Sequence, residues 1–468
     1  MNAFDASALG AILNVQRTAF RIEGNPSFAV RKDRLSRLRA ILAEKSAEFA
    51  RTISRDFAGR STHETLLLEA APLSAALRHT LSHLRAWMQP ETRRSSIEFA
   101  LMRNRVIHQP LGVVGIMAPW NYPLLLTFGP LIDVLAAGNR SLIKPSELLP
   151  ETSITLAEAI ASRFDPAEVA VVNGGIDIAE AFSRLPFDHL VFTGSTAVGR
   201  RVMAAAAENL TPVTLELGGK SPAILAPNAD LAAAARAIVF GKLMNAGQTC
   251  IAPDYVLVPR SRMDAFVNLL VERMEATYPP ATRMKDYTAI VGTTNRERLR
   301  HLIEDCRSRG SRVITPSGEW EDATHLAPTL VLDPPQDAPL MHQEIFGPVL
   351  PIVPYDGLNS ALAFVGARPT PLALYCFARD GATRDRVLAA TRSGGVTLNG
   401  TLLHIAQPDL PFGGIGPSGH GAYHSREGFK RFSHARSVAS VHGFDPSRLA
   451  CPPFGRLVRR LERFMLRR

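Results

Sequence analysis

The sequence predicts an α/β protein built on doubly wound parallel sheets, and three observations lead to this prediction. Short apolar runs alternate with helical segments and turns from residue 113 onward. Strands of a parallel sheet are buried on both faces, so short apolar runs are typical of them. The first ninety residues have helical patterns, such as Leu35, Leu38, Ile41 and Leu42 on one face. A chain of 468 residues is also long enough for two or three domains with sizeable cores.

The N-terminal part predicts helices over residues 29–50 and 64–87, followed by an extended segment at 97–108. The alternating part then predicts strands at 113–117, 141–144, 169–172, 189–192 and 213–216. The helices between them are expected at 124–137, 153–163, 176–185 and 198–209. Gly138-Asn139 is a typical helix end, so it marks the end of the first of these helices.

The alternation continues after Gly218-Gly219 and predicts a second α/β domain. Its strands are expected at 224–225, 255–258, 289–291, 312–314, 329–332 and 349–353. Helices are expected between several of them, such as 230–245 and 263–275. The chain ends in a basic amphipathic segment that starts at Arg456.

The basic charge balance does not by itself indicate a nucleic-acid partner. There are 53 Lys and Arg residues against 43 Asp and Glu residues, which gives a net charge of +10. Part of the excess lies in the last thirteen residues, where six arginines face only Glu462. The sequence has no basic stripe interleaved with aromatic residues, and no zinc-finger or RNA-module signature. We therefore expect no nucleic-acid binding.

Cysteine usage predicts neither a metal site nor a disulfide framework. The four cysteines are far apart, with no Cys-x-x-Cys pair and no Cys/His metal spacing. So few thiols fit a reducing compartment. The N-terminus lacks the basic region and apolar stretch of a secretory signal, and no eighteen-residue window is uninterruptedly apolar. We therefore expect a cytoplasmic protein without a membrane-spanning helix.

Cys250, in Asn245-Ala-Gly-Gln-Thr-Cys250, is a candidate nucleophile. It is expected on a loop between a helix and a strand, where glycine and small polar neighbours leave room for a substrate. A thiol attacks as its thiolate, so its surroundings must lower its pKa. A single cysteine is more often a small buried apolar residue, so its context has to decide between the two interpretations.

Glu216 and Asn121 are candidates for two supporting roles. Glu216 ends a predicted strand, in Glu216-Leu-Gly-Gly-Lys220, where a partly buried carboxylate can act as a general base. Asn121 lies between Pro119 and Pro123, and a rigidly held side-chain amide can donate to a developing oxyanion. Both have common structural alternatives, because most glutamates lie on the surface and asparagine is frequent in turns.

Three further segments could bind a dinucleotide. The segment Phe192-Thr-Gly-Ser-Thr-Ala-Val-Gly199 leads from a strand into a helix, and helix N-termini favour phosphates. Lys144 and Glu147 follow another strand, where both could bond to ribose hydroxyls, and Glu344 and Phe346 form a compact cluster further along. Taken singly, each is better explained as an ordinary turn, and the glycine spacing of 194–199 is not that of the usual dinucleotide fingerprint.

Together these clusters resemble the motifs of the aldehyde dehydrogenase superfamily. In chain order they are Pro-Trp-Asn, Lys-Pro-Ser-Glu, Phe-Thr-Gly-Ser, Glu-Leu-Gly-Gly-Lys, Gly-Gln-Thr-Cys, Glu-x-Phe-Gly-Pro and Pro-Phe-Gly-Gly-Ile-Gly-Pro-Ser-Gly. The resemblance covers residues 17 to 453, approximately, and implies the aldehyde dehydrogenase fold. In that fold we expect a Rossmann-like NAD(P)-binding domain (1–95 and 113–216) and an α/β catalytic domain with the nucleophilic cysteine (217–413). A small bridging β-arm for oligomerisation (96–112 and 430–445) and a basic amphipathic tail (446–468) complete the expected organisation.

The resemblance also implies a role for each motif residue, with NAD or NADP as the cofactor. Cys250 would be the nucleophile, Glu216 the base that activates water, and Asn121 with the backbone N–H of Cys250 the oxyanion hole. The implied cofactor contacts are Lys144 and Glu147 to the adenosine ribose, Gly194, Ser195 and Gly199 to the phosphates, and Glu344 and Phe346 to the nicotinamide riboside. The implied reaction passes through a thiohemiacetal and a thioester that water hydrolyses.

Within the superfamily the sequence is similar to the class 3 branch. Its amino end starts late, and the segments Gly421-Ala-Tyr-His-Ser and Phe432-Ser-His-Ala-Arg436 are typical of that branch. Residues 56–65, 185–190 and 249–255 resemble the signatures of its coniferyl aldehyde dehydrogenases. The resemblance implies a homodimer and an aromatic aldehyde such as coniferaldehyde, or a medium- or long-chain aliphatic aldehyde, as substrate. Tyr122, near the predicted channel, suits either kind of substrate.

Two other functions stay open at this point. A dehydrogenase that transfers its thioester to coenzyme A often lacks the base at the position of Glu216, so the presence of Glu216 favours hydrolysis. A protein that binds membrane surfaces is the other alternative. In the tail, Leu457, Val458, Leu461, Phe464 and Met465 recur at helical spacing opposite the arginines. Such a helix could equally dock on its own body or on a partner.

Overall fold

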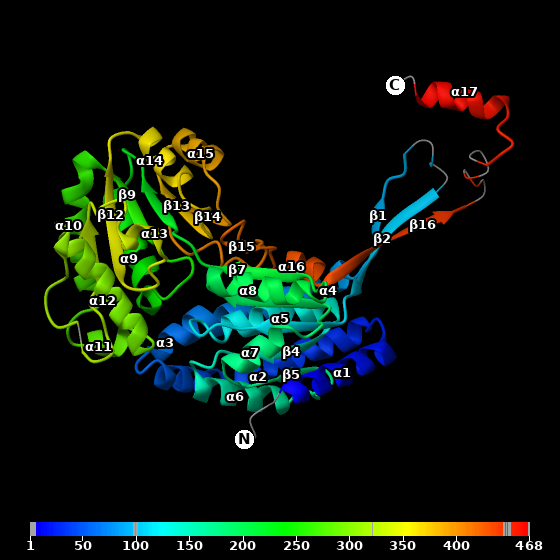
Figure 1. The fold of residues 1–468 in the computed structure, drawn as a ribbon, viewed down its shortest axis with the longest axis horizontal. Coiled ribbons are helices and arrows are strands. Elements are labelled where there is room, and N and C mark those ends of the chain that lie inside the picture. The colour runs from blue at the N-terminus through cyan, green and yellow to red at the C-terminus, as the bar shows by residue number, and fades with distance from the viewer. Residues whose placement is uncertain are drawn as a thin grey trace.

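The computed structural model describes residues 6–96, 99, 102–320, 322–442, 445, 447 and 451–466. Three sheets organise these residues (Figure 1). A six-stranded sheet and a seven-stranded sheet, each packed against helices, form the two lobes of the body. A three-stranded sheet, which we call the arm, projects away from both lobes (Figure 1). The structure has the mixed α/β architecture with parallel sheets that the sequence predicts.

The six-stranded sheet has the order β15-β7-β6-β3-β4-β5, and all neighbouring strands are parallel except β15 and β7. Its strands are β3 (Val113–Met117), β4 (Arg140–Lys144), β5 (Val169–Val171), β6 (His189–Gly194), β7 (Val213–Leu217) and β15 (Gly419–His420). The strand order changes direction between β3 and β6. Ligands of such sheets bind outside the carboxyl ends of the strands at this point.

Helices cover both faces of this sheet, and their bounds agree with the predicted ones to within a few residues. The connecting helices are α5 (Leu125–Ala137), α6 (Pro150–Ala161), α7 (Ile176–Ser183) and α8 (Thr196–Ala207). The N-terminal helices are α1 (Ala6–Glu23), α2 (Phe28–Asp56), α3 (Thr62–Thr65) and, after a π-helical turn (Leu66–Ala70), α4 (Ala71–Trp87). Helix α5 ends because Gly138 adopts the left-handed conformation, with φ 92°.

The seven-stranded sheet has the order β10-β11-β12-β9-β8-β13-β14, with only β10 antiparallel to its neighbour. Its strands are β8 (Pro222–Leu225), β9 (Tyr255–Pro259), β10 (Arg312–Ile314), β11 (Thr329–Leu332), β12 (Val349–Tyr355), β13 (Ala373–Phe377) and β14 (Gly395–Leu398). The longer helices of this lobe are α9 (Leu231–Leu243), α10 (Met263–Thr277), α12 (Thr293–Ser308), α14 (Leu358–Gly366) and α15 (Gly381–Ala390). Short helical turns occur at α11 (Arg283–Asp286) and α13 (Pro339–His342).

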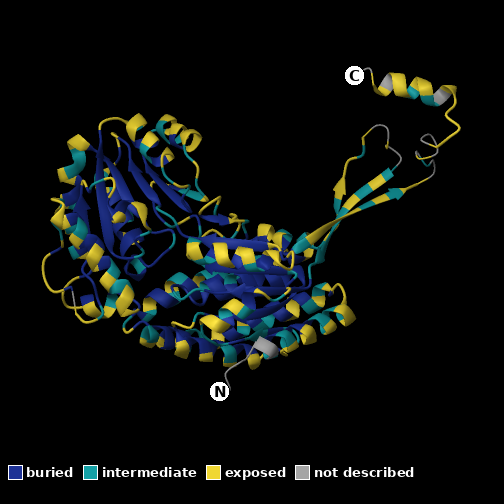
Figure 2. Cartoon of the chain, viewed as in Figure 1, coloured by how far each residue is buried: buried dark blue, intermediate teal, exposed yellow. Residues whose placement is uncertain are grey.

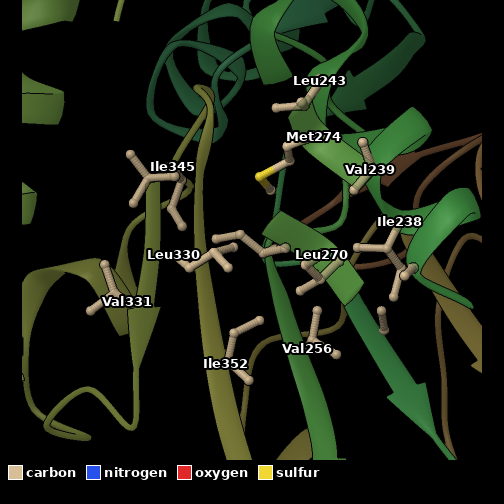
Figure 3. Close-up of a cluster of buried hydrophobic side chains, with 14 of the residues drawn as sticks. Ile238, Val239, Leu243, Val256, Leu270, Met274, Leu330, Val331, Ile345 and Ile352 are labelled. Atoms are coloured by element: carbon tan, nitrogen blue, oxygen red, sulfur yellow. The ribbon is translucent and has the colours of Figure 1, made fainter. Parts of the chain in front are cut away.

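The core of this lobe lies between the sheet and helices α9 and α10. Ile238 of α9 and Leu270 of α10 are fully buried against Val256 and Ile352 of the strands (Figure 3). The two lobes have separate clusters of buried side chains, so each has a core of its own (Figure 2).

The arm confirms the predicted pairing of two segments that are far apart in the sequence. Strand β2 (Met102–Pro110) pairs antiparallel with β16 (Ser433–Val441), and β1 (Glu91–Arg93) pairs with the other edge of β2. Residues 97, 98, 100 and 101 of the predicted extended segment lie outside the described residues. Helix α16 (Ser425–Arg431) packs beside the base of the arm. The role of the arm in oligomerisation stays a prediction.

Two parts of the predicted secondary structure are wrong. Residues 289–291 form no strand, because Ala289 and Ile290 donate to the carbonyls of Gly59 and Thr324, and the N–H of Val291 donates to the Gln248 side chain. Residues 289–291 therefore form hydrogen bonds with the loops that carry Gly59, Thr324 and Gln248, and they pair with no strand. The sequence patterns also missed β13 and β14 at one edge of the seven-stranded sheet.

The basic tail forms the helix α17 (Arg456–Met465), which stands clear of the body (Figure 1). Most of its described side chains are exposed (Figure 2). In the described part of the chain, no helix combines the length and the hydropathy needed to cross a membrane. The described residues also include no group of three potential metal ligands, and all four cysteines are free thiols.

Candidate active site

A cavity of about 470 Å³ lies at the carboxyl ends of the parallel strands of the six-stranded sheet. One wall comes from the loops that follow β3, β4, β6 and β7, and the other comes from loops and helix α12 of the seven-stranded lobe. Nine of the predicted site residues line it: Asn121, Lys144, Glu147, Gly194, Ser195, Glu216, Cys250, Glu344 and Phe346. The cavity therefore joins residues that are up to 225 positions apart, from Asn121 to Phe346.

The turn between β6 and α8 presents the N-terminus of a twelve-residue helix to this cavity. Ser195 is the N-cap residue, and its hydroxyl accepts a hydrogen bond from the Val198 N–H at 3.3 Å. The absence of a side chain at Gly194 leaves space beside the Phe192 ring, which an added Cβ would overlap. This exposed helix N-terminus is suited to bind an anionic group such as a phosphate.

Gly199 has a different place from the one the motif suggests. It lies inside α8, is buried, and does not line the cavity. A Cβ at this position would overlap the Leu217 side chain of β7. Gly199 therefore allows α8, the helix that begins at the turn, to pack closely against β7 of the sheet.

Lys144 and Glu147 form a polar pair at the end of β4. The Lys144 ammonium group is buried and donates to Glu147 Oε2 at 3.1 Å and to the Pro145 carbonyl at 2.9 Å. Glu147 itself is exposed at the rim of the cavity. A cation and a carboxylate next to each other offer both a donor and an acceptor to a ligand hydroxyl.

The loop that carries Cys250 begins with three consecutive residues in the left-handed region. Asn245, Ala246 and Gly247 have φ values of 53°, 50° and 75°. Non-glycine residues in this region cost about 1–3 kcal/mol each, so their surroundings must hold them. The buried Gln248 side chain does so, because it donates to the carbonyls of Asn245 and Ala289 and accepts from the Val291 N–H.

Asn121 is bonded directly to this loop. Its side-chain Nδ2 donates to the Gln248 carbonyl at 3.1 Å, and its carbonyl accepts from Asn245 Nδ2 at 2.9 Å. A carboxamide has two N–H groups, so the second one is available to donate into the cavity that Asn121 lines. The Asn121 amide and the loop that carries the Cys250 thiol are therefore held together by the same hydrogen bonds.

The three titratable groups at the centre of the cavity favour their neutral forms. Burial raises the pKa of the Cys250 thiol, and the nearby Glu344 and Glu216 carboxylates raise it further. The backbone N–H groups of Cys250 and Ile251 oppose this effect by bonding to the sulfur. Burial also raises the pKa of Glu216 well above the usual carboxyl range. The pKa of Glu344 is raised to about 8, mainly by burial and then by Asp254.

Both carboxyl oxygens of Glu216 are buried and have no hydrogen-bond partner among the described residues. Buried polar atoms normally have a protein or water partner. Glu216 is therefore suited to bond to a group that enters the cavity, such as a water molecule. A carboxyl group whose pKa is raised in this way is closer to the range of an effective general base.

Tyr122, the predicted substrate contact, does not line this cavity. Its ring is buried beneath the Arg60 guanidinium, with 5.0 Å between that group and the ring centre. Its hydroxyl forms a hydrogen bond of 2.7 Å with the Thr249 hydroxyl, next to Cys250. In this position it packs against the catalytic loop, and its contact with substrate stays a prediction.

Sequence patterns did not single out Arg298, which lines the cavity from α12. Its guanidinium donates to the Ile345 carbonyl at 2.6 Å and the Glu344 carbonyl at 3.4 Å, so it supports the loop that carries Glu344. No local signal marks it, because α12 contains several arginines at other positions. Phe346 has φ 50° and packs edge-on against Trp120, with 5.4 Å between the ring centres.

The chain is similar to known enzymes over nearly its whole length. A model of the aldehyde dehydrogenase family matches residues 2–438. A probable coniferyl aldehyde dehydrogenase of Pseudomonas aeruginosa is 47% identical over 98% of this chain and 96% of its own length. Mouse aldehyde dehydrogenase family 3 member A2 is 38% identical over 93% of this chain and 90% of its own length. The rat dimeric NADP-preferring aldehyde dehydrogenase is 36% identical over 96% of this chain and 98% of its own length.

The solved structures with similar folds include aldehyde dehydrogenases. A substrate-bound aldehyde dehydrogenase, AldH of Staphylococcus aureus, superposes with a TM-score of 0.92, covers 99% of this chain and 100% of its own, and is 33% identical. A Mycobacterium tuberculosis aldehyde dehydrogenase complexed with NAD+ has a TM-score of 0.84, covers 95% of this chain and 92% of its own, and is 30% identical. The predicted fold and class 3 kinship are thereby confirmed, and the chain belongs to the aldehyde dehydrogenase family of oxidoreductases.

Proposed function

We propose that this protein oxidises aldehydes, with aromatic ones such as coniferaldehyde among its substrates, to carboxylic acids by a cysteine-dependent mechanism with NAD or NADP. The observation that carries the proposal is the presence of Cys250, Asn121 and Glu216 around one cavity. A thiol, an amide donor and a buried carboxyl group without a partner among the described residues are the three groups that covalent acyl chemistry with hydrolysis requires.

The residues around the cavity fit a nicotinamide dinucleotide. The N-terminus of α8 at Ser195 offers N–H groups to the pyrophosphate, and Lys144 with Glu147 offers a donor and an acceptor to a ribose. Glu344 Oε1 is buried without a partner among the described residues, so it can accept from a second ribose. The relatives named for NADP preference and for bound NAD+ support both cofactors. When bound, the nicotinamide supplies a hydride acceptor.

In the first half of the reaction, Cys250 Sγ attacks the aldehyde carbon and forms a thiohemiacetal. Asn121 Nδ2 and the backbone N–H of Cys250 are the expected donors to its oxyanion, and each such donor contributes about 3 kcal/mol. Because burial keeps the thiol protonated, a base has to accept its proton before the attack. Glu216, once ionised, is suited to this step because its oxygens have no other partner among the described residues.

Loss of a hydride from the thiohemiacetal carbon leaves a thioester on Cys250. Glu216 first releases the thiol proton to solvent and then takes a proton from a water molecule, and the resulting hydroxide adds to the thioester carbon. Collapse of this second tetrahedral intermediate breaks the bond between carbon and sulfur and releases the acid. The buried position of Glu216 at the end of β7 keeps this base inside the cavity.

The proposed substrate class rests on kinship and on aromatic side chains near the site. Several of the most similar relatives are named for coniferyl aldehyde. The Phe412 ring is stacked between His404 and His424, with 6.0 Å and 5.5 Å between ring centres. Next to this stack, burial raises the pKa of the Tyr423 hydroxyl, and the nearby Glu216, Asp133 and Cys250 raise it further. Such an aromatic group near the thiol suits a flat aromatic aldehyde.

The first experiment measures formation of the reduced nicotinamide with coniferaldehyde, benzaldehyde and a series of alkanals. Each aldehyde is tested with NAD and NADP, with and without coenzyme A, beside Cys250→Ala. Turnover that needs Cys250 and no coenzyme A supports the proposal. Turnover that depends on coenzyme A would favour the acylating alternative, and activity that survives in Cys250→Ala would contradict the mechanism.

We also propose that the protein is a homodimer joined through the arm. Among the described residues, strand β16 lies at an edge of its sheet and pairs only with β2, and such edges accept a further strand. A relative is named as dimeric. Light scattering during gel filtration measures the molar mass, and the mass of a single chain would contradict the proposal.

A second proposed role concerns the tail. We propose that α17 binds an anionic lipid surface, because it stands clear of the body and carries four arginines against one glutamate. Amphipathic helices with such a charge balance are attracted to anionic headgroups. Sedimentation with phosphatidylserine vesicles should recover the full chain and not a chain that ends at Pro453. Vesicles of phosphatidylcholine alone are the control, and equal binding to both would contradict an electrostatic contact.

A further inference from the structure

Arg60 is a fully buried arginine that lies behind the active-site cavity. It is in the turn between α2 and α3, where Ala58 and Gly59 have φ values of 56° and 126°. Its guanidinium lies between two rings, with 5.1 Å to the centre of Phe57 and 5.0 Å to that of Tyr122. It does not line the cavity, so it can affect the reaction only through other residues.

Two buried glutamates share this guanidinium. Arg60 Nη1 donates to Glu69 Oε1 at 2.9 Å, and Arg60 Nε lies 3.7 Å from Glu64 Oε2. The same Nη1 also donates to the Asn121 carbonyl at 3.3 Å. The cation thus compensates two buried carboxylates and contacts the backbone of the predicted oxyanion residue directly.

Each glutamate in turn holds one of the two catalytic loops. Glu69 Oε2 accepts from the N–H groups of Leu124 and Leu125, at 2.9 Å and 3.1 Å, directly after the Asn121 segment. Glu64 accepts from the Asn245 N–H at 3.1 Å, at the first left-handed residue of the Cys250 loop. It also accepts from the Thr288 hydroxyl at 2.7 Å.

We infer that Arg60 is a positioning residue that sets the placement of Asn121 relative to Cys250. The inference rests on the proposed function, because the placement matters only if these two residues act on one substrate. Its physical basis is that one side chain connects the Asn121 segment, through Glu69, with the Cys250 loop, through Glu64. A misplacement of about 1 Å can cost on the order of 100-fold in rate, so loss of this connection should be visible in catalysis.

Arg34 offers a matched control for the loss of a buried arginine. It is buried to the same degree and is bonded to two carboxylates, Glu23 at 2.8 Å and Glu168 at 2.9 Å. It lies on α2, and among the described residues its hydrogen bonds and ion pairs go to none that line the cavity. Arg34→Met therefore reports the effect of lost stability without the effect on the catalytic loops.

The experiment compares Arg60→Met, Arg60→Lys and Arg34→Met by steady-state kinetics, thermal unfolding and alkylation of Cys250. Alkylation by iodoacetamide is followed on the isolated Cys250 peptide, and the exposed Cys451 is the internal reference. In Arg60→Met we expect kcat to fall roughly 10- to 100-fold while the KM for the cofactor changes less than about 2-fold. The rate and pH midpoint of Cys250 alkylation should change while those of Cys451 do not.

Arg60→Lys should recover part of kcat, because one ammonium group can replace some of the contacts but not all of them. Arg34→Met should lower the midpoint of unfolding and leave kcat and Cys250 alkylation within about 2-fold of the wild type. If Arg34→Met loses as much kcat as Arg60→Met at equal loss of stability, or if Arg60→Met keeps full kcat, the inference is wrong.

Glu64→Gln provides a second test if Arg60→Met does not fold. A neutral amide keeps the size of the side chain but removes the negative charge beside Arg60, and its nitrogen cannot accept a hydrogen bond where the second carboxyl oxygen does. We expect a fall in kcat of roughly 3- to 10-fold and the same selective change in Cys250 alkylation. Alkylation needs neither cofactor nor aldehyde, so it still tests the positioning if the protein has no dehydrogenase activity. An unchanged alkylation profile in Glu64→Gln would overturn the inference.

Discussion

Gly218 lies directly against the Glu344 carboxyl group, so closely that a Cβ at position 218 would overlap both carboxyl oxygens. The glycine comes from the segment after β7, and Glu344 comes from the loop before β12. The two lobes therefore meet at this contact. Glu344 can face the cavity only because residue 218 has no side chain.

Gly218→Ala should consequently weaken cofactor binding by pushing Glu344 aside. We expect the KM for NAD or NADP to rise roughly 10-fold, because a displaced carboxyl group loses its hydrogen bond to a ribose hydroxyl. The midpoint of thermal unfolding should change little, since the carboxyl group can swing into the cavity. Gly381→Ala on α15, where an added Cβ would meet only the flexible Arg384 side chain at 3.7 Å, is the control substitution. An unchanged KM in Gly218→Ala would show that Glu344 does not hold the cofactor.

The pKa of Glu344, raised to about 8, predicts a pH dependence of cofactor binding. Because the pKa is raised, the group is protonated below about 8 and becomes a carboxylate as the pH increases through that value. A carboxylate accepts hydrogen bonds from ribose more strongly, so the KM for the cofactor should fall between pH 7 and pH 9, approximately. The measurement is KM against pH for the wild type and Glu344→Gln, and the variant should lack this dependence.

Glu216→Gln should separate the two halves of the reaction. General bases contribute about 100- to 10,000-fold, so steady-state turnover should fall at least about 100-fold. A burst of up to one reduced nicotinamide per active site should still form, because hydride loss precedes hydrolysis of the thioester. The burst should be slower than in the wild type, because an amide cannot accept the proton of the Cys250 thiol. Stopped-flow absorbance measures both phases. Cys250→Ala should show no burst, and normal turnover in Glu216→Gln would rule out the assigned base.

The pKa of Glu216 also gives the sign of the pH dependence of kcat. Burial raises this pKa, and the group acts as a base only when ionised, so kcat should increase with pH through the folded-state value. The pH dependence of the free energy of unfolding has the opposite sign. The protonated carboxyl group is favoured in the folded state, so its contribution is complete below the unfolded pKa and is lost as the pH rises through the folded one. Chemical unfolding of wild type and Glu216→Gln at several pH values measures this contribution.

Glu147→Gln should change the preference between the two cofactors. The carboxylate at the exposed rim, 3.1 Å from Lys144, would repel the additional phosphate of NADP while it accepts from the ribose hydroxyl of NAD. Removing its charge should shift the ratio of kcat/KM values toward NADP by roughly 10-fold. Lys144→Met, in contrast, should impair both cofactors. An unchanged ratio in Glu147→Gln would place the adenosine ribose elsewhere.

The sequence predicted the six-stranded sheet well because each of its central strands is a short apolar run that ends at a turn. Val113–Met117, for example, is buried at every position. Residues 289–291 have the same apolar character, yet tertiary hydrogen bonds from Gln248, Gly59 and Thr324 hold them in an irregular form. Local composition cannot distinguish these two outcomes, since the partners of the second are distant in the sequence.

The candidate site was likewise predictable only where a local sequence pattern places a residue. Motif residues at strand ends, such as Lys144 and Gly194, were brought together by the topology of a parallel sheet and could be predicted. Gly199 was assigned to the phosphate turn, but it packs against Leu217, because one glycine has the same pattern whether it faces a ligand or a neighbouring strand. Arg298 and Arg60 could not be found from the sequence, since their function depends on contacts with loops far along the chain.

The end of the chain completes a sheet that begins more than 300 residues earlier. Strand β15 pairs with β7 at Glu216, and the Leu217 N–H donates to the Ser418 carbonyl. Asp133 on α5 accepts from the N–H groups of His424 and Ser425, and the Asn139 side chain donates to the Phe432 carbonyl. A nascent chain still emerging from the ribosome can pair β3 to β7, but Glu216 lacks its β15 neighbour until residue 420 has emerged. The pairing beside Glu216 therefore forms only after residue 419 has been synthesised, and a translation product truncated before it would carry the thiol without the completed sheet beside its base.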